Sequence, residues 1–566
     1  MRLRSAFPWL VTAVVAALFA CFLFWPLWET LRAAFFEISG RPTLAYVALL
    51  FRSPVYVEGF VNALGVATMT TVLALSFGFA IAFLLDRYDF VGKRAVLLLV
   101  PMPLIVPPFV GAIGFKQILG RTGSLNALLI DIGVLDAAHA IDWLRHGRFW
   151  AVVVLTAMHL YPILYFNISA ALSNVNPEME EAAESLGCTG VRKLAKITLP
   201  LILPSVFAAT TLTFIWALTE LGVPLMCDYT RITSVQIFAG LKDIGRVPLV
   251  HALVTVVLLA TVALYLAARL SFGRVTHALA TKGDRRRTPT KLASWRGALV
   301  ALVTGTIVAA AALPNVGVVL AALSSHWYGT VLPSELTLSH FEGALGHAIV
   351  LPSIGNSLRY VALSTALDAG VGLAIAYVVV RTRFKGAALL DAAAMIPLAV
   401  PGLVMAFGYL AISRDGRPFA FLDPVRDPTA LLVMAYAIRR LPFVVRSTSA
   451  GLQQVSVTLE EASQNLGASS LRTFRRVTLP LLAPHLLAGG VFAFALSMLE
   501  VSDSLILAQR QSTFPITKAI FELFQLLGEG RFIAAALGVW AMAFLGVAIA
   551  FARSLLGRRF GGIFRF

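Results

Sequence analysis

Long apolar stretches recur along this chain and leave few folds open to it. Runs of about 20 apolar residues, enough to cross the roughly 30 Å hydrocarbon core of a bilayer, can be placed at about twelve positions. With 58% hydrophobic and 13% charged residues, the chain lacks the polar surface of a soluble protein. We therefore predict an all-α polytopic membrane protein. The predicted spans are 8–27, 60–85, 95–115, 149–173, 200–226, 247–268, 297–322, 356–380, 387–409, 429–452, 480–507 and 532–552.

The second half of the chain repeats the first. Residues 62–92 match residues 356–386 at an offset of 294, and residues 180–204 match 460–484 at an offset of 280. In the second pair, 11 of 25 positions are identical. We therefore predict two tandem six-helix repeats related by a pseudo-two-fold axis. The expected units are residues 1–271 and 297–566, joined by a basic linker at 272–296.

Positive charge is concentrated in alternate connections between the predicted spans. The clusters "RKLAK", "GDRRRTPTK" and "RTFRR" supply much of the net charge of +17. Because basic loops remain in the cytoplasm, we expect both termini inside, with residues 174–199, 269–296 and 453–479 cytoplasmic. This charge then reflects topology and contact with anionic membrane lipid, and no nucleic acid partner is expected. The three cysteines are too far apart for a disulfide framework or a cysteine zinc site.

Two polar loops interrupt this apolar pattern at equivalent places. "NPEMEEAAESLG" predicts a short helix with Asn176 as its N-cap, Pro177 at its first position and acids in its first turn. Gly187 ends this helix and Gly467 ends the second copy, since glycine most readily takes the left-handed conformation at such an end. The alternative is an ordinary amphipathic helix at the membrane surface. Two copies at equivalent positions favour a docking device for a two-fold partner.

The loops also resemble a known family. E-A-A-x-x-x-G followed by I-x-L-P is similar to the signature loop in permease subunits of bacterial binding-protein-dependent (type I) ABC importers. The second copy departs mildly, with serine for alanine and valine for isoleucine. The resemblance implies that loops 174–199 and 453–479 form helices that couple to a cytoplasmic ATPase. The residues that carry it are Glu181, Ala182, Ala183, Gly187, Ile197, Leu199 and Pro200, and Glu461, Ala462, Ser463, Gly467, Val477, Leu479 and Pro480.

The resemblance implies partners as well as a fold. The chain has no G-x-x-x-x-G-K-[ST] phosphate loop, so we expect no enzymatic activity and no cofactor on it. ATP and Mg²⁺ would be bound by two copies of a separate ATPase subunit, and a periplasmic binding protein would deliver the substrate. The expected location is the bacterial inner membrane, crossed many times. Fused two-unit permeases of this length most resemble ferric-iron importers, with thiamine, polyamine and 2-aminoethylphosphonate permeases as alternatives.

A second class of transporter shares this architecture. Twelve helices in two repeats also describe a major-facilitator secondary transporter, and "GFAIAFLLDRYDFVGKR" imitates the Gly-x-x-x-Asp-Arg loop of that family. The counterpart loop in the second unit has Val380 where Asp86 stands. A facilitator also gives no reason for two acidic helices after the fourth and tenth spans. The importer therefore remains the better interpretation.

Ionisable side chains inside the predicted spans are candidates for the substrate path, because such groups are costly in a membrane. Glu220 and Glu500 are equivalent at an offset of 280. Since ferric ion is a hard cation that prefers oxygen ligands, these two carboxylates are candidate transient ligands for it. The same acids would suit a cationic organic substrate, or could pair structurally with nearby arginines. The other candidates are Asp503, His159, Arg439 and Arg440.

Overall fold

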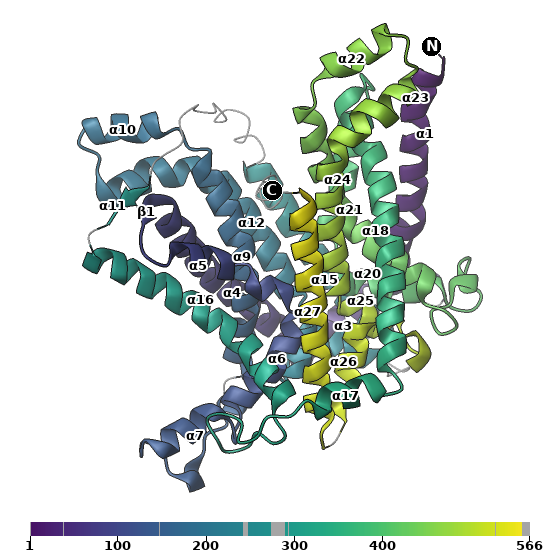
Figure 1. Ribbon diagram of the computed structural model, residues 1–566. Coiled ribbons are helices and arrows are strands. Elements are labelled where there is room, and N and C mark those ends of the chain that lie inside the picture. The colour runs from purple at the N-terminus through teal and green to yellow at the C-terminus, as the bar shows by residue number, and fades with distance from the viewer. Residues whose placement is uncertain are drawn as a thin grey trace.

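The computed structural model describes residues 2–37, 39–146, 148–241, 247–272, 289–292, 294–526 and 528–556. Its first half consists almost entirely of helices (Figure 1). The elements up to residue 272 are α1 (Arg2–Phe19), η1 (Ala20–Phe24), α2 (Trp25–Phe35), α3 (Ala45–Arg52), α4 (Pro54–Arg87), β1 (Tyr88–Asp89), α5 (Lys93–Leu99), η2 (Met102–Ile105), α6 (Pro108–Leu119), α7 (Ser124–Asp131), η3 (Ala137–His139), α8 (Trp143–His146), α9 (Arg148–Ser173), α10 (Pro177–Ser185), α11 (Gly190–Lys193), η4 (Leu194–Thr198), α12 (Leu199–Leu218), α13 (Gly222–Met226), α14 (Thr233–Gly240) and α15 (Val247–Phe272).

The second half follows the same order of elements. Its short strand β2 lies parallel to β1, so the end of the linker returns to the end of α4. Residues 273–288 of the predicted linker lie outside the described residues. The elements are β2 (Thr290–Lys291), α16 (Ser294–Leu323), α17 (Ser339–Gly346), α18 (Val350–Arg381), α19 (Ala387–Met395), η6 (Ile396–Ala399), α20 (Gly402–Ile412), η7 (Ala420–Leu422), α21 (Thr429–Gln454), α22 (Val457–Asn465), α23 (Ser470–Thr473), η8 (Phe474–Thr478), α24 (Leu479–Met498), α25 (Ser502–Leu507), η9 (Gln511–Thr513), α26 (Ile516–Gln525) and α27 (Gly530–Leu556).

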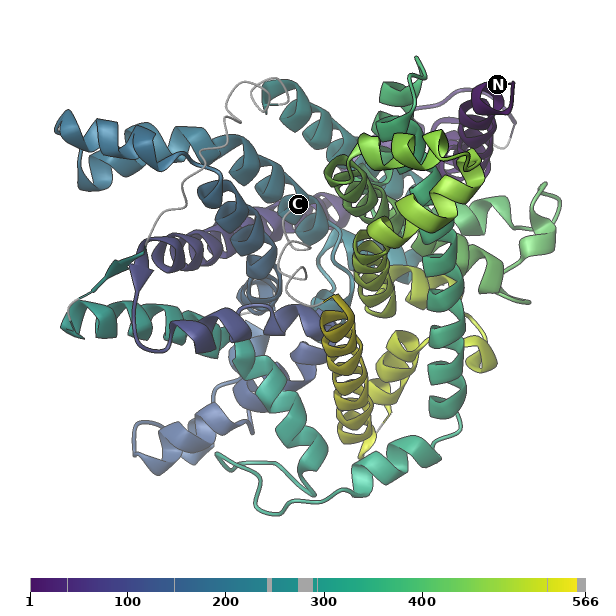
Figure 2. The same ribbon diagram turned by 45° about the horizontal axis from the view of Figure 1, so that its top comes forward.

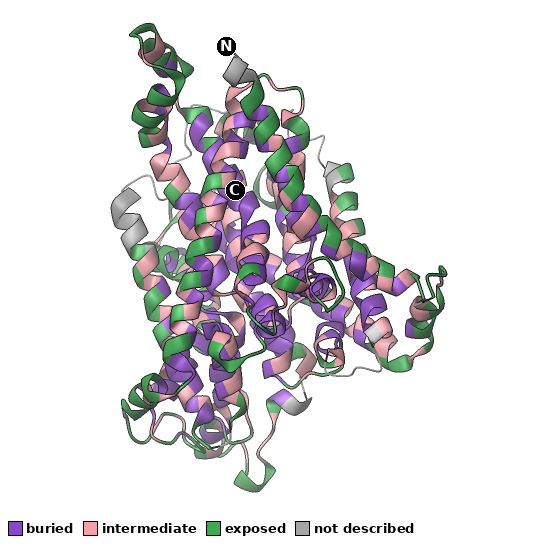
Figure 3. Cartoon of the chain, turned by 90° about the vertical axis from the view of Figure 1, so that its right-hand side faces the viewer, coloured by how far each residue is buried: buried purple, intermediate pink, exposed green. Residues whose placement is uncertain are grey.

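The helices confirm a polytopic membrane protein. Among the described residues, nine helices are long and apolar enough to cross a bilayer, and two bent pairs raise the number to eleven. The predicted span at 429–452 coincides with α21, which has the length of a span but contains Arg439, Arg440 and Arg446. Large apolar residues on the spans are exposed, as expected for surfaces that face lipid, and Figure 3 shows exposed segments along the helices. Examples are Trp9, Leu10, Leu302 and Val547.

Proline breaks the third span of each unit. The helical segments on either side of the break bend by 104° in the first unit and 97° in the second. Both breaks contain a 3₁₀ turn followed by a proline, Pro107 before α6 and Pro401 before α20. Proline has no backbone N–H and cannot continue a helical ladder. The repeat therefore preserves a broken span in both units.

The first span of each unit packs against the other unit. Helix α2 lies on α20, and α16 lies on α6. Glycine makes both contacts possible: a Cβ at Gly408 would collide with the backbone of Pro26, and a Cβ at Gly114 would collide with the backbone around Pro314. The hydroxyl of Tyr409 donates a hydrogen bond of 2.7 Å to the carbonyl of Phe22 across the first contact. The two units are thus interlocked.

The two polar loops lie at the same end of the molecule. Helices α22 and α23 of the second unit lie at the top of Figure 1, where α1 also begins, and α10 and α11 of the first unit lie at its upper left. Figure 2 shows the two loops standing apart from one another at that end. At the opposite end, α7 and α17 connect the spans. This arrangement agrees with an N-terminus on the same side as both predicted coupling loops.

Candidate functional site: two coupling loops and a central ionic cluster

Each coupling helix begins at a side-chain cap. The Asn176 side chain accepts a hydrogen bond of 3.1 Å from the backbone N–H of Glu178, at the start of α10. Ser456 does the same for Thr458 at the start of α22. Such caps satisfy one of the backbone N–H groups that a helix leaves unpaired at its start. The predicted N-cap at Asn176 is confirmed.

Glycine ends both helices, as the sequence predicted. Gly187 has φ +77° and Gly467 has φ +88°, in the left-handed region that other residues rarely adopt. After α10, the N–H of Cys188 donates to the carbonyl of Ala183 at 2.8 Å, and Ala468 donates to Ser463 at 3.1 Å after α22. This bond from the second residue beyond the helix is the Schellman arrangement. Both chains therefore turn back toward the membrane in the same way.

The two loops expose matched apolar side chains. Three pairs of large apolar residues at an offset of 280 are exposed in both copies. Leu186 and Leu466 are 88% and 90% exposed, beside the two glycines. Exposed apolar residues of this kind mark a surface that contacts another protein or the membrane. The other two pairs are Met179 with Leu459 and Val191 with Leu471.

The signature residues themselves divide between surface and interior. Glu181 and Ala182 are exposed, whereas Ala183 is buried. In the second loop Glu461 and Ala462 are exposed and Ser463 is half-buried.

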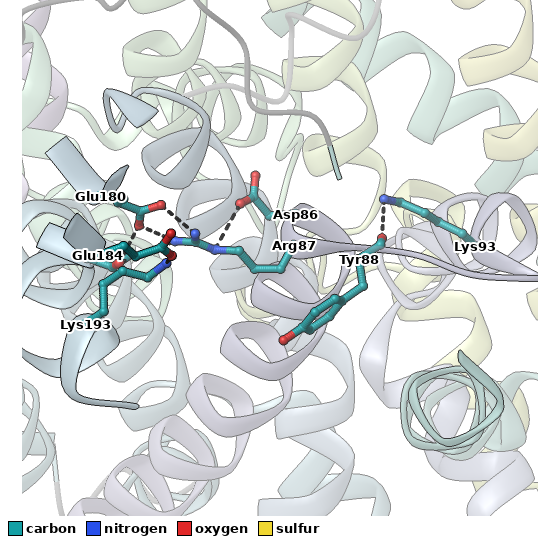
Figure 4. Close-up of polar contacts among 8 residues, drawn as sticks. Asp86, Arg87, Tyr88, Lys93, Glu180, Glu184 and Lys193 are labelled. Carbon is teal, nitrogen blue, oxygen red and sulfur yellow. Dashed lines mark hydrogen bonds and ion pairs between the residues drawn. The ribbon is translucent and has the colours of Figure 1, made fainter. Parts of the chain in front are cut away.

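The buried acid of each loop is one that sequence reasoning missed. Glu180, directly before Glu181, is 3% exposed. Its carboxylate pairs with both terminal nitrogens of Arg87, the last residue of α4, and one of these bonds measures 2.5 Å (Figure 4). The hydroxyl of Thr198 donates to the same carboxylate at 2.5 Å. Asp86 lies on the other side of the guanidinium, 3.6 Å from its Nε.

The second unit contains the same three residue types at the equivalent positions. Arg381 ends α18 and donates from Nε to the carboxylate of Glu460 at 3.0 Å. The hydroxyl of Thr478 donates to this carboxylate at 3.1 Å. Arg381 also donates to the carbonyl of Val455 at 2.7 Å, just before α22. The signal was present in the sequence, because all three residues are identical between the two repeats.

In the membrane interior, the second unit holds a buried ionic cluster. Arg439 donates from Nη1 to Glu500 at 2.7 Å and to Asp503 at 2.8 Å. Arg440 donates to the same Glu500 oxygen at 2.5 Å and to the carbonyl of Leu496 at 3.1 Å. Buried charges of opposite sign stabilise one another when they are hydrogen-bonded in this way. For Glu500, the structure thus realises the alternative in which the acid pairs with the arginines.

The first unit has no such cluster among the residues described. Glu220 accepts hydrogen bonds from the backbone N–H groups of Gly222 and Val223, at 3.1 and 3.2 Å. His159, at the position equivalent to Arg439, bonds through Nδ1 to the carbonyl of Pro103 at 2.8 Å. The two equivalent acids therefore have different partners.

The fifth span of each unit breaks beside these acids. Predicted span 200–226 ends as a helix at Leu218, and 480–507 ends at Met498, before the short helices α13 and α25. The two breaks approach each other, since a Cβ on Gly222 would lie 3.3 Å from Cγ1 of Val501. The equivalent acids thus stand at the contact between the units. Among the described residues, no three His, Cys, Asp or Glu side chains form a preformed metal site.

A small pocket lies between the units next to this cluster. It is bounded by α12 of the first unit and by α21 and the broken third span of the second. Arg439 and Arg440 are the charged residues in its described lining. The guanidinium groups therefore separate Glu500 and Asp503 from the pocket. The remaining lining residues are Ile215, Trp216, Thr219, Pro397, Leu398, Val400, Pro401 and Phe443.

Comparison with known proteins identifies the family. The model of the family described as "Binding-protein-dependent transport system inner membrane component" matches residues 74–277 and again residues 369–560. A ferric transport system permease protein of Actinobacillus pleuropneumoniae is 26% identical over 81% of this chain and 64% of its own length. This chain therefore spans less than two thirds of that relative.

Further relatives are also named as permease proteins of transport systems. A putative ferric transport system permease of Haemophilus influenzae is also 26% identical, over 81% of this chain and 70% of its own length. The molybdenum transport system permease of Escherichia coli is 32% identical over 30% of this chain and 79% of its own. The two family matches fall on the two repeats, each with its coupling loop. This chain belongs to the family of inner-membrane permease components of binding-protein-dependent ABC transport systems.

Proposed function

We propose that this chain is the membrane-spanning part of an ATP-driven importer for ferric iron. It receives the ion from a periplasmic binding protein and releases it into the cytoplasm by alternating access. Two copies of a cytoplasmic ATPase subunit bind ATP and Mg²⁺ and dock on α10 and α22. The observation that carries this proposal is the matched set of exposed apolar side chains on the two loops, with Leu186 and Leu466 most exposed. Two identical partners require two equivalent surfaces.

In each unit, one continuous helical segment connects the docking surface with the central contact between the units. Residues Gly190–Leu218 and Ser470–Met498 each run from a coupling loop to the central contact between the units. Movement of a docked ATPase subunit would therefore reach the breaks after Leu218 and Met498. Separation of these breaks opens the central pocket toward one side of the membrane. Helices α12 and α21, which bound the pocket, belong to different repeats. A change in the distance between them therefore changes the size of the pocket.

Iron as the substrate is supported by relatives named for ferric transport, which align with 81% of this chain. Carboxylate oxygen suits ferric ion, and Glu220 and Glu500 flank the central contact. The guanidinium groups of Arg439 and Arg440 both bond to Oε2 of Glu500 and repel a cation, so iron would bind this carboxylate more readily once they move away. The ion would then replace Arg439 and Arg440 as the partner of this carboxylate.

An oxyanion is the second candidate substrate, favoured by the pocket itself. Arg439 and Arg440 place positive charge on its lining. Guanidinium groups bind oxyanions with paired hydrogen bonds, and they repel a bare ferric ion. The molybdenum relative matches only a third of the chain or less, which is why iron remains the first candidate.

Uptake by the reconstituted complex tests both candidates. The chain, its ATPase and its binding protein are placed in liposomes, and ATP-dependent uptake of ferric iron, molybdate, sulfate, thiamine, putrescine and 2-aminoethylphosphonate is measured side by side. Uptake of iron alone supports the first proposal. Uptake of molybdate or sulfate without iron transfers the assignment to the oxyanion, and uptake of thiamine, putrescine or the phosphonate refutes both.

Docking is tested separately, on the purified complex. We expect Leu186→Ser combined with Leu466→Ser to weaken association with the ATPase by about tenfold or more, because burying one leucine contributes about 1.5–3 kcal/mol. Leu332→Ser is the matched control, since Leu332 is 62% exposed but lies outside both loops. Equal ATPase binding by the double variant and by the control would refute docking on these surfaces.

A further inference from the structure

The buried acid of each coupling loop joins three separate elements. We call Arg87, Glu180 and Thr198 the first clamp, and their equivalents Arg381, Glu460 and Thr478 the second clamp. In each clamp, an arginine at the end of the second span and a threonine before the fifth span hold the same carboxylate. Glu180 and Glu460 are 3% and 8% exposed. The coupling helix is thereby fastened to two spans at once.

Both clamps lie at a π-helical turn. Thr198 is the last residue of η4, and Thr478 is the last residue of η8. These turns connect α11 with α12 and α23 with α24. A π turn contains an extra residue within the helical ladder, and helices change direction at such turns. Its presence at the same position in both units places an irregular helical turn directly beside the attachment to the coupling helix.

The docking face and the clamp occupy different sides of the coupling helix. Leu186 and Glu181 are exposed, whereas Glu180 is buried against Arg87. A buried carboxylate that loses its partner is strongly destabilised, so the clamp resists separation when the helix is pulled or pushed. A force applied to the exposed face therefore reaches α4 and α12 through Glu180.

We propose that the two clamps transmit movement from the docked ATPase subunits to the membrane spans, and that Arg87, Glu180, Thr198, Arg381, Glu460 and Thr478 are positioning residues for this coupling. The inference rests on the proposed docking of ATPase subunits on α10 and α22. It assigns docking to the exposed residues and transmission to the buried ones. Loss of a clamp should leave ATPase association intact and separate ATP hydrolysis from uptake.

The central experiment measures uptake per ATP hydrolysed in liposomes containing the whole complex. We expect Glu180→Gln and Glu460→Gln each to lower this ratio by about tenfold or more, since each substitution leaves a buried guanidinium without its charged partner. Glu178→Gln is the matched control: Glu178 lies on the same helix, two residues away, and is exposed. The exchange of Arg87→Glu together with Glu180→Arg should restore much of the ratio.

Milder variants guard against loss of folding. Thr198→Val and Thr478→Val keep the shape of the side chain and remove only the hydroxyl that donates to the carboxylate. We expect each to lower uptake per ATP several-fold with ATPase binding unchanged. An unchanged ratio in the glutamine and valine variants would overturn the inference, as would loss of ATPase binding in the valine variants.

A second measurement needs no partner. Hydrogen exchange of the α10 backbone in the detergent-solubilised chain should become faster in Glu180→Gln and return toward wild type in the charge exchange. Unchanged exchange in Glu180→Gln would refute the clamp itself. If exchange responds as expected but the wild-type chain binds no ATPase, the proposed function fails and the clamp geometry stands. The two failures are thus distinguishable.

Discussion

The two coupling loops are alike where the two halves of the membrane interior are not. Both loops have a side-chain cap, a left-handed glycine and a clamp, whereas only Glu500 of the four charged residues in the interior cluster has an identical equivalent, Glu220. His159 and Leu160 of the first unit stand where Arg439 and Arg440 stand in the second, and Val223 stands where Asp503 stands. Under the proposed function, the surfaces that bind two identical ATPase subunits must match. A single central pocket imposes no such requirement on the residues around it.

The difference extends to how each loop is stabilised. In the first loop, Lys193 pairs with Glu184. In the second, the equivalent residues are Thr473 and Gln464, and the Thr473 hydroxyl lies 3.0 Å from the hydroxyl of Ser463. In the first clamp, two nitrogens of Arg87 bond to the carboxylate of Glu180. In the second, Arg381 bonds to Glu460 and also to the carbonyl of Val455. The same geometry is thus reached with different contacts.

The largest expected effect is on the free energy of unfolding, and it distinguishes the interior of the second unit from that of the first. Arg439→Gln should lower the free energy of unfolding by about 3–5 kcal/mol, because it deprives two buried carboxylates of a partner. His159→Gln, at the equivalent position, should cost about 1 kcal/mol for one hydrogen bond. Thermal unfolding in detergent measures both. Arg446→Gln on the same helix is the control, since its pair with Asp391 is half-exposed. Equal losses for Arg439→Gln and His159→Gln would contradict the asymmetry.

A smaller change should affect the two loops equally. Valine at Gly187 or Gly467 forces a left-handed backbone that costs about 1–2 kcal/mol or more for a residue with a Cβ. No atom lies within 4 Å of the added Cβ at either position, so the strain is in the backbone alone. We expect Gly467→Val to separate ATP hydrolysis from uptake while the chain stays inserted.

Asparagine provides the control at these glycines, since it tolerates the left-handed region. Gly187→Asn and Gly467→Asn should retain most of the uptake per ATP. Normal transport by the Gly187→Val, Gly467→Val double variant would show that the helix ends do not matter for coupling.

The smallest effect distinguishes the loops from one another. Lys193→Gln removes an ion pair whose glutamate side chain is 48% exposed, so we expect a loss of about 0.2–1 kcal/mol. Because salt screens exposed charges, the loss should shrink as ionic strength rises. Hydrogen exchange of α10 measured at low and high salt checks this. A loss that does not depend on salt would argue for a packing role of the Lys193 side chain.

Much of the fold could be predicted from the sequence, because its signals are local or repeated. The apolar runs are long enough to identify the spans. Asn176 marks the start of a short helix and Gly187 and Gly467 mark the ends of two, because of their own conformational preferences. The repeat is visible in the sequence alone, as residue matches at offsets of 294 and 280. The predicted spans 200–226 and 480–507 are interrupted after Leu218 and Met498, where the two units come into contact.

The clamp and the central cluster were harder to predict. Arg87 and Glu180 are far apart in the sequence, and only the packing of α4 beside the coupling loop brings them together. Glu220 and Glu500 were expected to act as a matched pair. Their surroundings differ because Leu160 cannot pair with an acid and Arg440 can. Equivalence in a repeat fixes where a residue lies, whereas its partners come from neighbouring helices that have diverged.

The interlocked first spans have a consequence for how the protein is made. The ribosome releases α6 well before α16, the helix that later covers Gly114. The interval is longer still between the synthesis of α2 and that of α20, the helix that carries Gly408. During synthesis, each of these glycine surfaces therefore stays uncovered by its partner helix until that helix has been made. Neither half of the chain completes its own packing, so folding is finished only when the third span of the second unit has entered the membrane.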